Sequence, residues 1–384
     1  MLYRNFGKTN EKVSILGYGC MRLPLLESGD ASKIDEEKAI KLIRYAIDNG
    51  VNYIDTAYPY HNDGKNPAGY SEPFLAKVLK DGYREKVNVA TKLPSWLIKS
   101  REDMDKYLNE QLERLGIDQI DFYLVHTLDR DKWKNLKNLG VREFLDSAIK
   151  DGRIKYAGFS FHDYIDIFKE IVDAYDWSFC QIQYNYIDEN FQGGTEAIEY
   201  AYSKGLGITI MEPLRGGKLV NNLPNEVKDI FEKANDIHKI TRTPQEWALR
   251  WIWNRKEVSC VLSGMNALEQ IDENIKIASM SQSESFSDEE IKTVEKARDI
   301  YLQKVKVGCT GCGYCMPCPR GVVIPDIFSI YNDYFMFGEN TMYSRLDSKE
   351  KASNCIKCGL CEKQCPQHIE IRKELENVKN LFEK

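Results

Sequence analysis

Two runs of closely spaced cysteines lie near the end of this sequence. Residues 309–319 read CTGCGYCMPCP, and residues 355–366 read CIKCGLCEKQCP. Thiolates at such short spacings form disulfides, bind zinc or hold iron–sulfur clusters. The chemistry of the C-terminal part of the chain depends on which of these three applies.

The composition of the whole chain weakens the disulfide interpretation. The chain has 384 residues, of which 42% are hydrophobic and 29% charged, and its net charge is −6. The length and composition are typical of about two globular domains. The negative net charge argues against a nucleic-acid partner, because nucleic acids bind basic surfaces. No apolar run approaches the ~18 residues of a membrane span, and the first residues do not resemble a signal peptide. We therefore expect a cytoplasmic protein without membrane association, where structural disulfides are rare.

The spacing of the eight C-terminal cysteines favours iron–sulfur clusters over zinc. The first run has the pattern C-x2-C-x2-C-x2-C-P, and the second has C-x2-C-x2-C-x3-C-P. A zinc site takes two close pairs and closes at four ligands. In two-cluster ferredoxins, by contrast, three evenly spaced cysteines hold one cluster and the fourth ligates the other. The predicted ligands of the two [4Fe–4S] clusters are Cys309, Cys312, Cys315 and Cys365 for cluster 1, and Cys355, Cys358, Cys361 and Cys318 for cluster 2.

The segments around these cysteines show helical periodicity. Residues 324–337 carry apolar side chains at helical spacing after an early proline, and residues 370–384 form a second amphipathic pattern. The tail is therefore expected to be a small, mainly helical ferredoxin-like domain. The three other cysteines, Cys20, Cys180 and Cys260, lie in or beside apolar runs and are expected to be buried small hydrophobic residues.

The first 300 residues have a different pattern, in which eight apolar runs alternate with helical segments. The runs are 14–19, 51–55, 87–92, 120–126, 154–160, 179–185, 207–213 and 258–264, and the helical segments include 36–49, 101–115, 141–150 and 268–278. Eight strand–helix units in about 270 residues fit a parallel (β/α)8 TIM barrel. The alternative, a doubly wound sheet, lacks its G-x-G-x-x-G motif at a helix start. We expect a barrel over 1–300, with an N-terminal hairpin at its bottom, and the ferredoxin-like domain over 301–384.

The ends of the predicted strands carry residues suited to proton transfer. Chemistry in a TIM barrel gathers at the C-terminal ends of its strands. These ends include Asp55, Lys92 and His126, and Tyr60 follows Asp55 by five residues. A free phenol has a pKa of about 10, which a neighbouring ammonium lowers, while a carboxylate holds that ammonium in place. The four residues together predict a proton-donating site in which the histidine orients a carbonyl.

Residues 1 to about 300 resemble the aldo/keto reductase superfamily. The motifs that carry the resemblance are YIDTAYPY, ATK, YLVH, AGFS and GMNALEQIDEN. The resemblance implies hydride transfer between a nicotinamide cofactor and a small carbonyl or alcohol. Tyr60 would be the general acid/base, Asp55 and Lys92 would tune its pKa, and His126 would orient the substrate. With CTGCGYCMPCPRGVVIP in its tail, the whole chain resembles the iron–sulfur branch of this superfamily, which is common in anaerobes.

The same resemblance implies contacts to the nicotinamide cofactor. Ser160 and Gln181 would hold the carboxamide, residues 212–219 would wrap the pyrophosphate, and residues 263–274 would lie along the adenosine. The residues assigned in this way are Ser160, Gln181, Glu212, Pro213, Leu214, Arg215, Gly217, Lys218, Ser263, Gly264, Met265, Gln270 and Asn274. Relatives place Lys and Arg around a 2′-phosphate where this chain has Gly264 and Gln270, and they commonly place Asn where it has Phe161. The choice between NADPH and NADH therefore stays open, and Arg215 and Lys218 could supply the charge.

Two classes of function fit these features. The first is a nicotinamide-dependent oxidoreductase whose two clusters relay electrons, with a redox partner such as ferredoxin or flavodoxin. The second is a ferredoxin-type electron-transfer protein whose barrel is a cofactor-holding or docking scaffold. The intact set Asp55, Tyr60, Lys92 and His126 favours the first. A flavin could join two-electron to one-electron chemistry, but no short flavin motif is present, and the substrate and the oligomeric state stay open.

Overall fold

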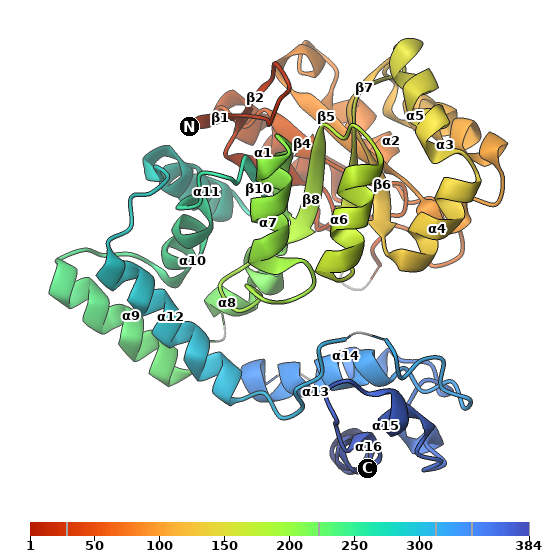
Figure 1. Cartoon of the computed structure of the whole chain (residues 1–384). Coiled ribbons are helices and arrows are strands. Elements are labelled where there is room, and N and C mark those ends of the chain that lie inside the picture. Colours follow the sequence, from red (N-terminus) through yellow and green to blue (C-terminus); the bar gives the residue numbers. More distant parts are fainter. Residues whose placement is uncertain (28–29, 222, 312, 339–340, 384) are drawn as a thin grey trace. The chain divides into compact units, whose positions relative to one another are not determined.

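The computed structural model describes residues 1–27, 30–221, 223–311, 313–338 and 341–383 (Figure 1). The chain divides into two compact units. The first consists of Met1–Arg215 and Ala248–Phe286, and the second of Gly216–Trp247 and Ser287–Lys384. The domain boundary expected at residue 300 stays a prediction, because residues on both sides of it belong to the second unit.

The first unit is built on a closed barrel of eight parallel strands, so the doubly wound alternative is wrong. The strands are, in order round the barrel, β3 (Leu16–Gly19), β4 (Tyr53–Asp55), β5 (Asn88–Leu93), β6 (Ile120–Leu128), β7 (Ile154–Phe161), β8 (Phe179–Gln183), β9 (Gly207–Met211) and β10 (Cys260–Ser263), which returns to β3. Each strand overlaps one of the eight predicted apolar runs, and β5, β6 and β7 extend past the ends of their runs by one or two residues. The predicted (β/α)8 barrel is thereby confirmed.

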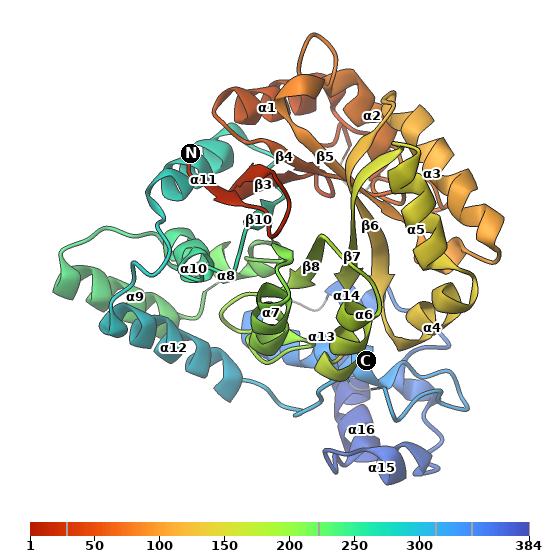
Figure 2. The ribbon, with the colours of Figure 1, turned by 45° about the horizontal axis from the view of Figure 1, so that its top comes forward.

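Helices surround the strands on the outside of the barrel (Figure 2). They are α1 (Glu36–Asp48), α2 (Ser71–Val78), α3 (Arg101–Leu115), α4 (Arg130–Asn138), α5 (Val141–Lys150), α6 (Ile165–Ala174), α7 (Gly194–Ser203), α10 (Pro244–Trp253) and α11 (Leu268–Met280). Helix α1 begins where the Asp35 carboxylate accepts a hydrogen bond from the Lys38 amide, and it buries Leu42 and Ile43. Such an apolar stripe on an otherwise charged helix is what attaches it to the barrel wall.

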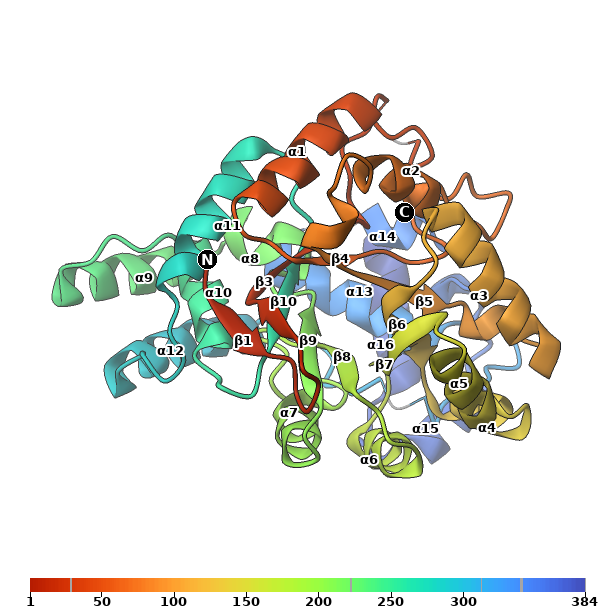
Figure 3. The same ribbon diagram turned by 90° about the horizontal axis from the view of Figure 1, so that it is seen from above.

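An N-terminal hairpin closes one end of the barrel, as expected. Strands β1 (Tyr3–Asn5) and β2 (Lys12–Ser14) pair antiparallel, and the next residue after β1, Phe6, is fully buried. Its ring packs against Tyr53, Phe122 and Phe179, with 4.6 Å between the Phe6 and Phe122 centroids. Tyr53 and Phe179 are the first residues of their strands. The aromatic cluster therefore fills the N-terminal end, and the opposite end remains for chemistry. Figure 3 shows the ribbon from above, with β1 near the strands of the barrel.

The second unit is helical. Its helices are α8 (Lys218–Asn221), α9 (Asn225–His238), α12 (Asp288–Gln303), α13 (Ile324–Phe337), α14 (Thr341–Ser344), α15 (Leu360–Gln364) and α16 (Ile371–Phe382). Helices α13 and α16 confirm the two helices predicted around the cysteine runs, and they bury Phe328 and Val378 in a common core. Among all helices described here, none combines the length and apolar character that crossing a bilayer demands.

Candidate active site and cysteine cavities

Asp55 and Lys92 form a buried ion pair at the C-terminal end of the barrel. Asp55 ends β4 and Lys92 lies near the end of β5, so neighbouring parallel strands bring them together. Lys92 Nζ donates to Asp55 Oδ1 at 2.7 Å, to Oδ2 at 2.8 Å and to the Thr56 carbonyl at 2.8 Å. The two side chains are only 1% and 3% exposed. The ammonium is thus held in one position by three oxygen acceptors.

Tyr60 and His126 complete the predicted set of four residues. Lys92 Nζ lies 3.4 Å from Tyr60 Oη, within hydrogen-bond distance. The rings of Tyr60 and His126 are 6.2 Å apart between centroids, and the partly exposed Trp96 ring lies 5.3 Å from His126. The structure therefore brings all four predicted residues together and places one aromatic side chain beside them that was not among the predicted catalytic residues.

Burial sets the protonation of these groups. It raises the pKa of the Tyr60 phenol, and the Lys92 ammonium opposes that rise without overcoming it. The expectation of a lowered phenol pKa is therefore not met, because loss of water around a phenolate costs more than the ammonium returns. Burial by itself would lower the pKa of Lys92. The interactions with Asp55 and Tyr60 outweigh burial, so the pKa of Lys92 is raised. Tyr60 is thus a protonated donor beside a charged ammonium.

His126 is neutral in this site. Burial and then the charge of Lys92 hold its pKa well below the ordinary value. Its Nδ1 atom is buried without a hydrogen-bond partner among the described residues. A neutral imidazole offers one donor and one acceptor nitrogen. His126 is therefore suited to hydrogen bonding with a substrate oxygen and unsuited to carrying charge.

A second buried network lies behind the site and supports it. The carboxylate of Glu72, on α2, accepts hydrogen bonds from Thr91 Oγ1 at 2.7 Å, Gln111 Nε2 at 2.7 Å and Arg114 Nε at 2.8 Å. Gln111 Nε2 also donates to the Lys92 carbonyl at 3.0 Å. Strand β5 and helices α2 and α3 are thus tied together directly behind Lys92.

The same network holds the loop that carries Tyr60. Arg114 donates to the Gly69 carbonyl, and the Gly69 amide donates to the Tyr58 carbonyl at 2.7 Å. A Cβ atom at Gly69 would lie 1.9 Å from the Tyr60 carbonyl oxygen, so only glycine permits this approach. Sequence reasoning missed Glu72 and Gly69, whose roles depend on contacts between segments distant in sequence.

Ser160 and Gln181 occupy neighbouring strands where the nicotinamide carboxamide was expected. Gln181 is 2% exposed, and its Oε1 atom has no hydrogen-bond partner in the described part of the chain. Ser160 Oγ accepts a hydrogen bond from the Thr127 amide at 2.7 Å and keeps its own hydrogen to donate. A carboxamide has both an NH2 donor and a carbonyl acceptor. The orphaned acceptor and the hydroxyl donor therefore fit the group.

The segment expected to wrap the pyrophosphate runs from the first unit into the second after Arg215. Glu212 and Arg215 adopt positive φ values of 52° and 45°, so the backbone turns sharply through Pro213 and Leu214. The Arg215 guanidinium lies 3.4 Å from Asp188. The other two predicted residues, Gly217 and Lys218, belong to the second unit, where Lys218 Nζ pairs with Asp333 of α13 at 3.0 Å.

The segment expected along the adenosine is held largely by its own side chains. The predicted residues here are Ser263, Gly264, Met265, Gln270 and Asn274. Asn274 Nδ2 donates to Ser263 Oγ at 3.1 Å, and the Met265 carbonyl accepts from Tyr18 Oη at 2.5 Å. Gln270 Oε1 accepts from the Asn266 amide at 2.9 Å.

Arg22 is a basic residue beside the cofactor segments that sequence reasoning missed. Its side chain packs over Gly264, 3.4 Å from the position of an added Cβ, and its Nη2 lies 3.1 Å from Glu212 Oε1. The side chain is 46% exposed. Its position in the loop after β3, at the catalytic end of the barrel, could have identified it from the sequence. This arginine stands between two segments that resemblance assigns to the cofactor.

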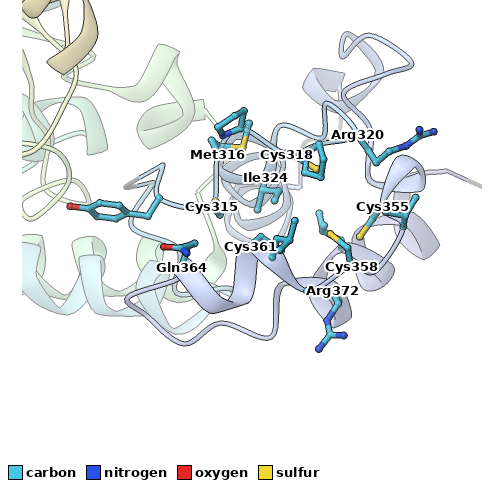
Figure 4. A pocket seen from close by; sticks show the side chains of 17 residues that line it. Cys315, Met316, Cys318, Arg320, Ile324, Cys355, Cys358, Cys361, Gln364 and Arg372 are labelled. Atoms are coloured by element: carbon cyan, nitrogen blue, oxygen red, sulfur yellow. The ribbon is translucent and has the colours of Figure 1, made fainter.

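Five cysteines from both runs line one cavity of about 130 Å³ in the second unit, which we call the outer cavity, and four of them form one predicted ligand set. These four are Cys318, Cys355, Cys358 and Cys361, the set predicted for cluster 2, and Cys315 also borders the cavity (Figure 4). Within the described ranges no three His, Cys, Asp or Glu side chains converge on a single point. These four cysteines border a space, as the ligands of a multi-atom cluster do.

A second group of cysteines lines a neighbouring cavity, which we call the inner cavity. Cys309, Cys315 and Cys365 border it, together with buried apolar residues such as Phe328. These are three of the four ligands predicted for cluster 1, and the fourth, Cys312, lies outside the described residues. The grouping of Cys365 with the first run, and of Cys318 with the second, fits the crossed pattern of two-cluster ferredoxins.

Comparison with known proteins agrees with this architecture. Residues 15–299 match the Aldo/keto reductase family, and residues 308–370 match the 4Fe-4S dicluster domain. The first match covers most of the chain, so the protein belongs to the aldo/keto reductase family and has a C-terminal dicluster domain. It is an oxidoreductase of a family that binds nicotinamide cofactors.

The similar proteins cover the barrel. The chain is 26% identical over 311 residues to a probable aldo-keto reductase 1 of Glycine max, covering 72% of this chain and 84% of that protein. It is 25% identical over 307 residues to the L-galactose dehydrogenase of Arabidopsis thaliana, covering 76% and 92%. An aldo-keto reductase of Bacillus halodurans in its holo form superimposes with a TM-score of 0.62 at 24% identity, covering 77% and 96%. That structural likeness shows the fold alone.

Proposed function

We propose that this protein transfers hydride between NAD(P)H and a small carbonyl or alcohol, with Tyr60 as general acid/base. The observation that supports this most directly is the buried chain from Asp55 through Lys92 to Tyr60 at the catalytic end of the barrel. The nicotinamide supplies or accepts the hydride when it is bound. A carbonyl oxygen that becomes an alcohol needs a proton, and Tyr60 Oη holds one.

The other residues have distinct roles in this proposal. Lys92 stabilises negative charge as it develops on Tyr60 Oη, and Asp55 fixes Lys92 through two hydrogen bonds. His126, neutral and buried, orients the substrate oxygen. Ser160 and Gln181 hold the carboxamide. The segments 212–219 and 263–274 remain our proposal for the pyrophosphate and adenosine, and the choice between NADPH and NADH stays open.

Replacing Tyr60 by Phe tests the proposal. The substitution removes the hydroxyl and keeps the ring, so we expect kcat for carbonyl reduction to fall by about 10²–10⁴-fold. Tyr58→Phe is the matched control, because the Tyr58 hydroxyl, in the same loop, bonds to Glu110 instead of Lys92. Binding of NAD(P)H, followed by nicotinamide fluorescence, should be unchanged in both variants. Reduction by the Tyr60 variant at the parent rate would refute the assignment.

The iron–sulfur domain supports a further step in the proposal, electron exchange with a redox partner. The clusters supply one-electron exchange when they are bound. The inner and outer cavities share Cys315 and Ile324 in their walls, so the two sets of ligands are adjacent. We propose that the two clusters relay electrons to or from the barrel. A small acidic electron carrier is the partner that we infer.

The alternative is an electron-transfer protein that uses the barrel as a scaffold. The two proposals differ in what the barrel does alone. An oxidoreductase reduces carbonyls with NAD(P)H and loses this activity with Tyr60→Phe. A scaffold binds the nucleotide or a partner, exchanges electrons and shows no such dependence on Tyr60. The buried ion pair beside Tyr60 favours the oxidoreductase, because a scaffold has no need of a positioned acid.

A further inference from the structure

Both cavities have buried and exposed residues in their walls, but the large exposed apolar side chains lie at the outer cavity. Cys358, at the outer cavity, is exposed. The outer cavity is also bordered by Tyr314, Ile356 and Leu360, which are 64%, 60% and 54% exposed. The wall of the inner cavity includes Phe328, which is fully buried. Exposed residues such as Thr310 and Gln367 also border the inner cavity, so the feature that distinguishes the outer cavity is its large exposed apolar side chains.

The exposed apolar side chains at this cavity are not part of the hydrophobic core of the unit. Tyr314 comes from the first cysteine run and Ile356 and Leu360 come from the second, yet all three border one cavity. Scattered exposed apolar residues are ordinary, but a group of them around one feature marks a site of interaction. An aromatic and two aliphatic side chains are also the residue types that anchor protein interfaces.

Basic side chains accompany this apolar group. Arg320 borders the outer cavity, and Lys363 belongs to α15, a helix whose residues Leu360, Cys361 and Gln364 border it. Neither forms an ion pair with any residue that the structure describes, in contrast to Arg372, which pairs with Glu362 at 2.7 Å. Arg320 points outward from the cavity in Figure 4. The chain as a whole has a net charge of −6, so this is a locally basic region on an acidic protein. It would attract an acidic partner to one place on the surface.

We propose that Tyr314, Ile356 and Leu360 form the docking surface for a small acidic electron-carrier protein of the ferredoxin type, which Arg320 and Lys363 steer into place. This inference rests on the proposed function and adds to it the class of the redox partner and the place on the surface where electrons are exchanged. The exchange moves one electron and neither a proton nor a bond. When the carrier donates, it is oxidised by one electron and this protein is reduced by one. Weak electron-transfer encounters use small interfaces, which a group of this size can form.

The experiment measures binding of an acidic two-[4Fe–4S] ferredoxin to the anaerobically prepared holoprotein, with both proteins oxidised so that no electron moves. Leu360→Gln removes an apolar anchor at an exposed position, and we expect Kd to rise about tenfold, mainly through faster dissociation. Lys363→Glu reverses a steering charge, and we expect association to slow about tenfold at low salt and to lose part of its salt dependence. Lys296→Glu, an exposed lysine of α12, is the matched control and should bind like the parent.

The outcomes separate this inference from the proposed function. Carbonyl reduction by NAD(P)H is measured on the same preparations, and Leu360→Gln should leave it unchanged. Failure of the Tyr60→Phe test with intact ferredoxin binding would remove the proposed reaction and keep the docking surface. Equal affinity of the parent, Leu360→Gln and Lys363→Glu proteins would overturn the docking surface. So would the absence of ferredoxin binding, or self-association of the parent that Leu360→Gln abolishes.

Discussion

Lys92 is the residue on which the candidate active site is built. Three oxygen atoms hold its ammonium, and Tyr60 Oη lies 3.4 Å away. The site is so well buried that the phenol keeps its proton, with a raised pKa. An ammonium in such a position matters most when charge develops on the phenol during proton transfer, because electrostatic stabilisation is strongest where water is excluded.

The pH dependence of activity follows from the shifted pKa values of His126 and Tyr60. Burial holds the pKa of His126 well below about 6.5 and raises that of Tyr60 above about 10, so neither group titrates between them. We expect kcat/KM for carbonyl reduction to be flat from about pH 6.5 to about pH 9. Steady-state kinetics in overlapping buffers check this. An inflection near pH 6.5 that His126→Gln removes would show that the imidazole is not neutral.

The free energy of unfolding, in contrast to activity, is expected to depend on pH in the acid range. Below about pH 6.5 the unfolded chain takes up a proton at His126 that the folded chain does not bind. The contribution of this residue to the free energy of unfolding is therefore largest above that pH and falls as the pH drops.

Arg22 is expected to contribute to nucleotide binding. The aliphatic part of its side chain packs over Gly264 and its guanidinium pairs with Glu212, and these two residues belong to the two segments proposed for the cofactor. Hydrogen bonds from a charged group to phosphate contribute about 1.5–3 kcal/mol, so Arg22→Met should raise the Kd of NAD(P)H by about tenfold or more. The contact is remote from the reacting atoms, so kcat should change little. Fluorescence titration checks the first expectation and saturating kinetics the second, and unchanged Kd would contradict the role.

At the level of secondary structure, the buried network around Glu72 positions the strand and the loop that carry the site. Helix α2 supplies Glu72 and helix α3 supplies Gln111 and Arg114. Gln111 donates to the Lys92 carbonyl and Arg114 donates to the Gly69 carbonyl, while Glu72 accepts hydrogen bonds from both side chains. Two outer helices therefore fix the relative placement of Lys92 and Tyr60 without contacting substrate.

Removing the Glu72 carboxylate should destabilise the barrel strongly. Glu72→Ala leaves the Arg114 guanidinium, 17% exposed, without its carboxylate partner, and breaking a buried pair costs about 3–5 kcal/mol. Glu113→Ala, at an exposed site next to Arg114 on helix α3, is the control and should change stability by no more than about 0.5 kcal/mol. Urea midpoints followed by circular dichroism compare the two variants. Similar small shifts in both would show that the network is not a structural support.

At the scale of the whole molecule, two units divide the chemistry. The barrel holds the residues for proton transfer, and the second unit holds the two cysteine runs. Anaerobically prepared protein should contain about eight irons and eight sulfides per chain, the content of two cubanes. Cys358→Ser should lower the iron content, whereas Cys180→Ser, at a buried position in β8, should not. Stoichiometric zinc without labile sulfide in the parent protein would contradict the prediction.

The elements themselves were predictable from the sequence. Each of the eight apolar runs overlaps a barrel strand, and the segment 324–337 is helix α13 with the same bounds. The spacing of the cysteine runs predicted a two-cluster domain, and the family comparison supports it. Periodicity and spacing are properties of a short stretch of chain, and strand, helix and ligand-run geometry repeat over the same short distances. These features therefore follow from local sequence.

Protonation and support of the site were decided only by the tertiary structure. Spacing suggested that Lys92 would lower the pKa of Tyr60, but burial by surrounding elements raises it. Glu72 and Arg22 looked like ordinary charged residues until the fold placed them against Lys92's strand and against Glu212. Desolvation depends on every neighbour that excludes water, and those neighbours come from strands and helices far apart in the chain. No local pattern records that sum, so it appears only when the barrel is closed.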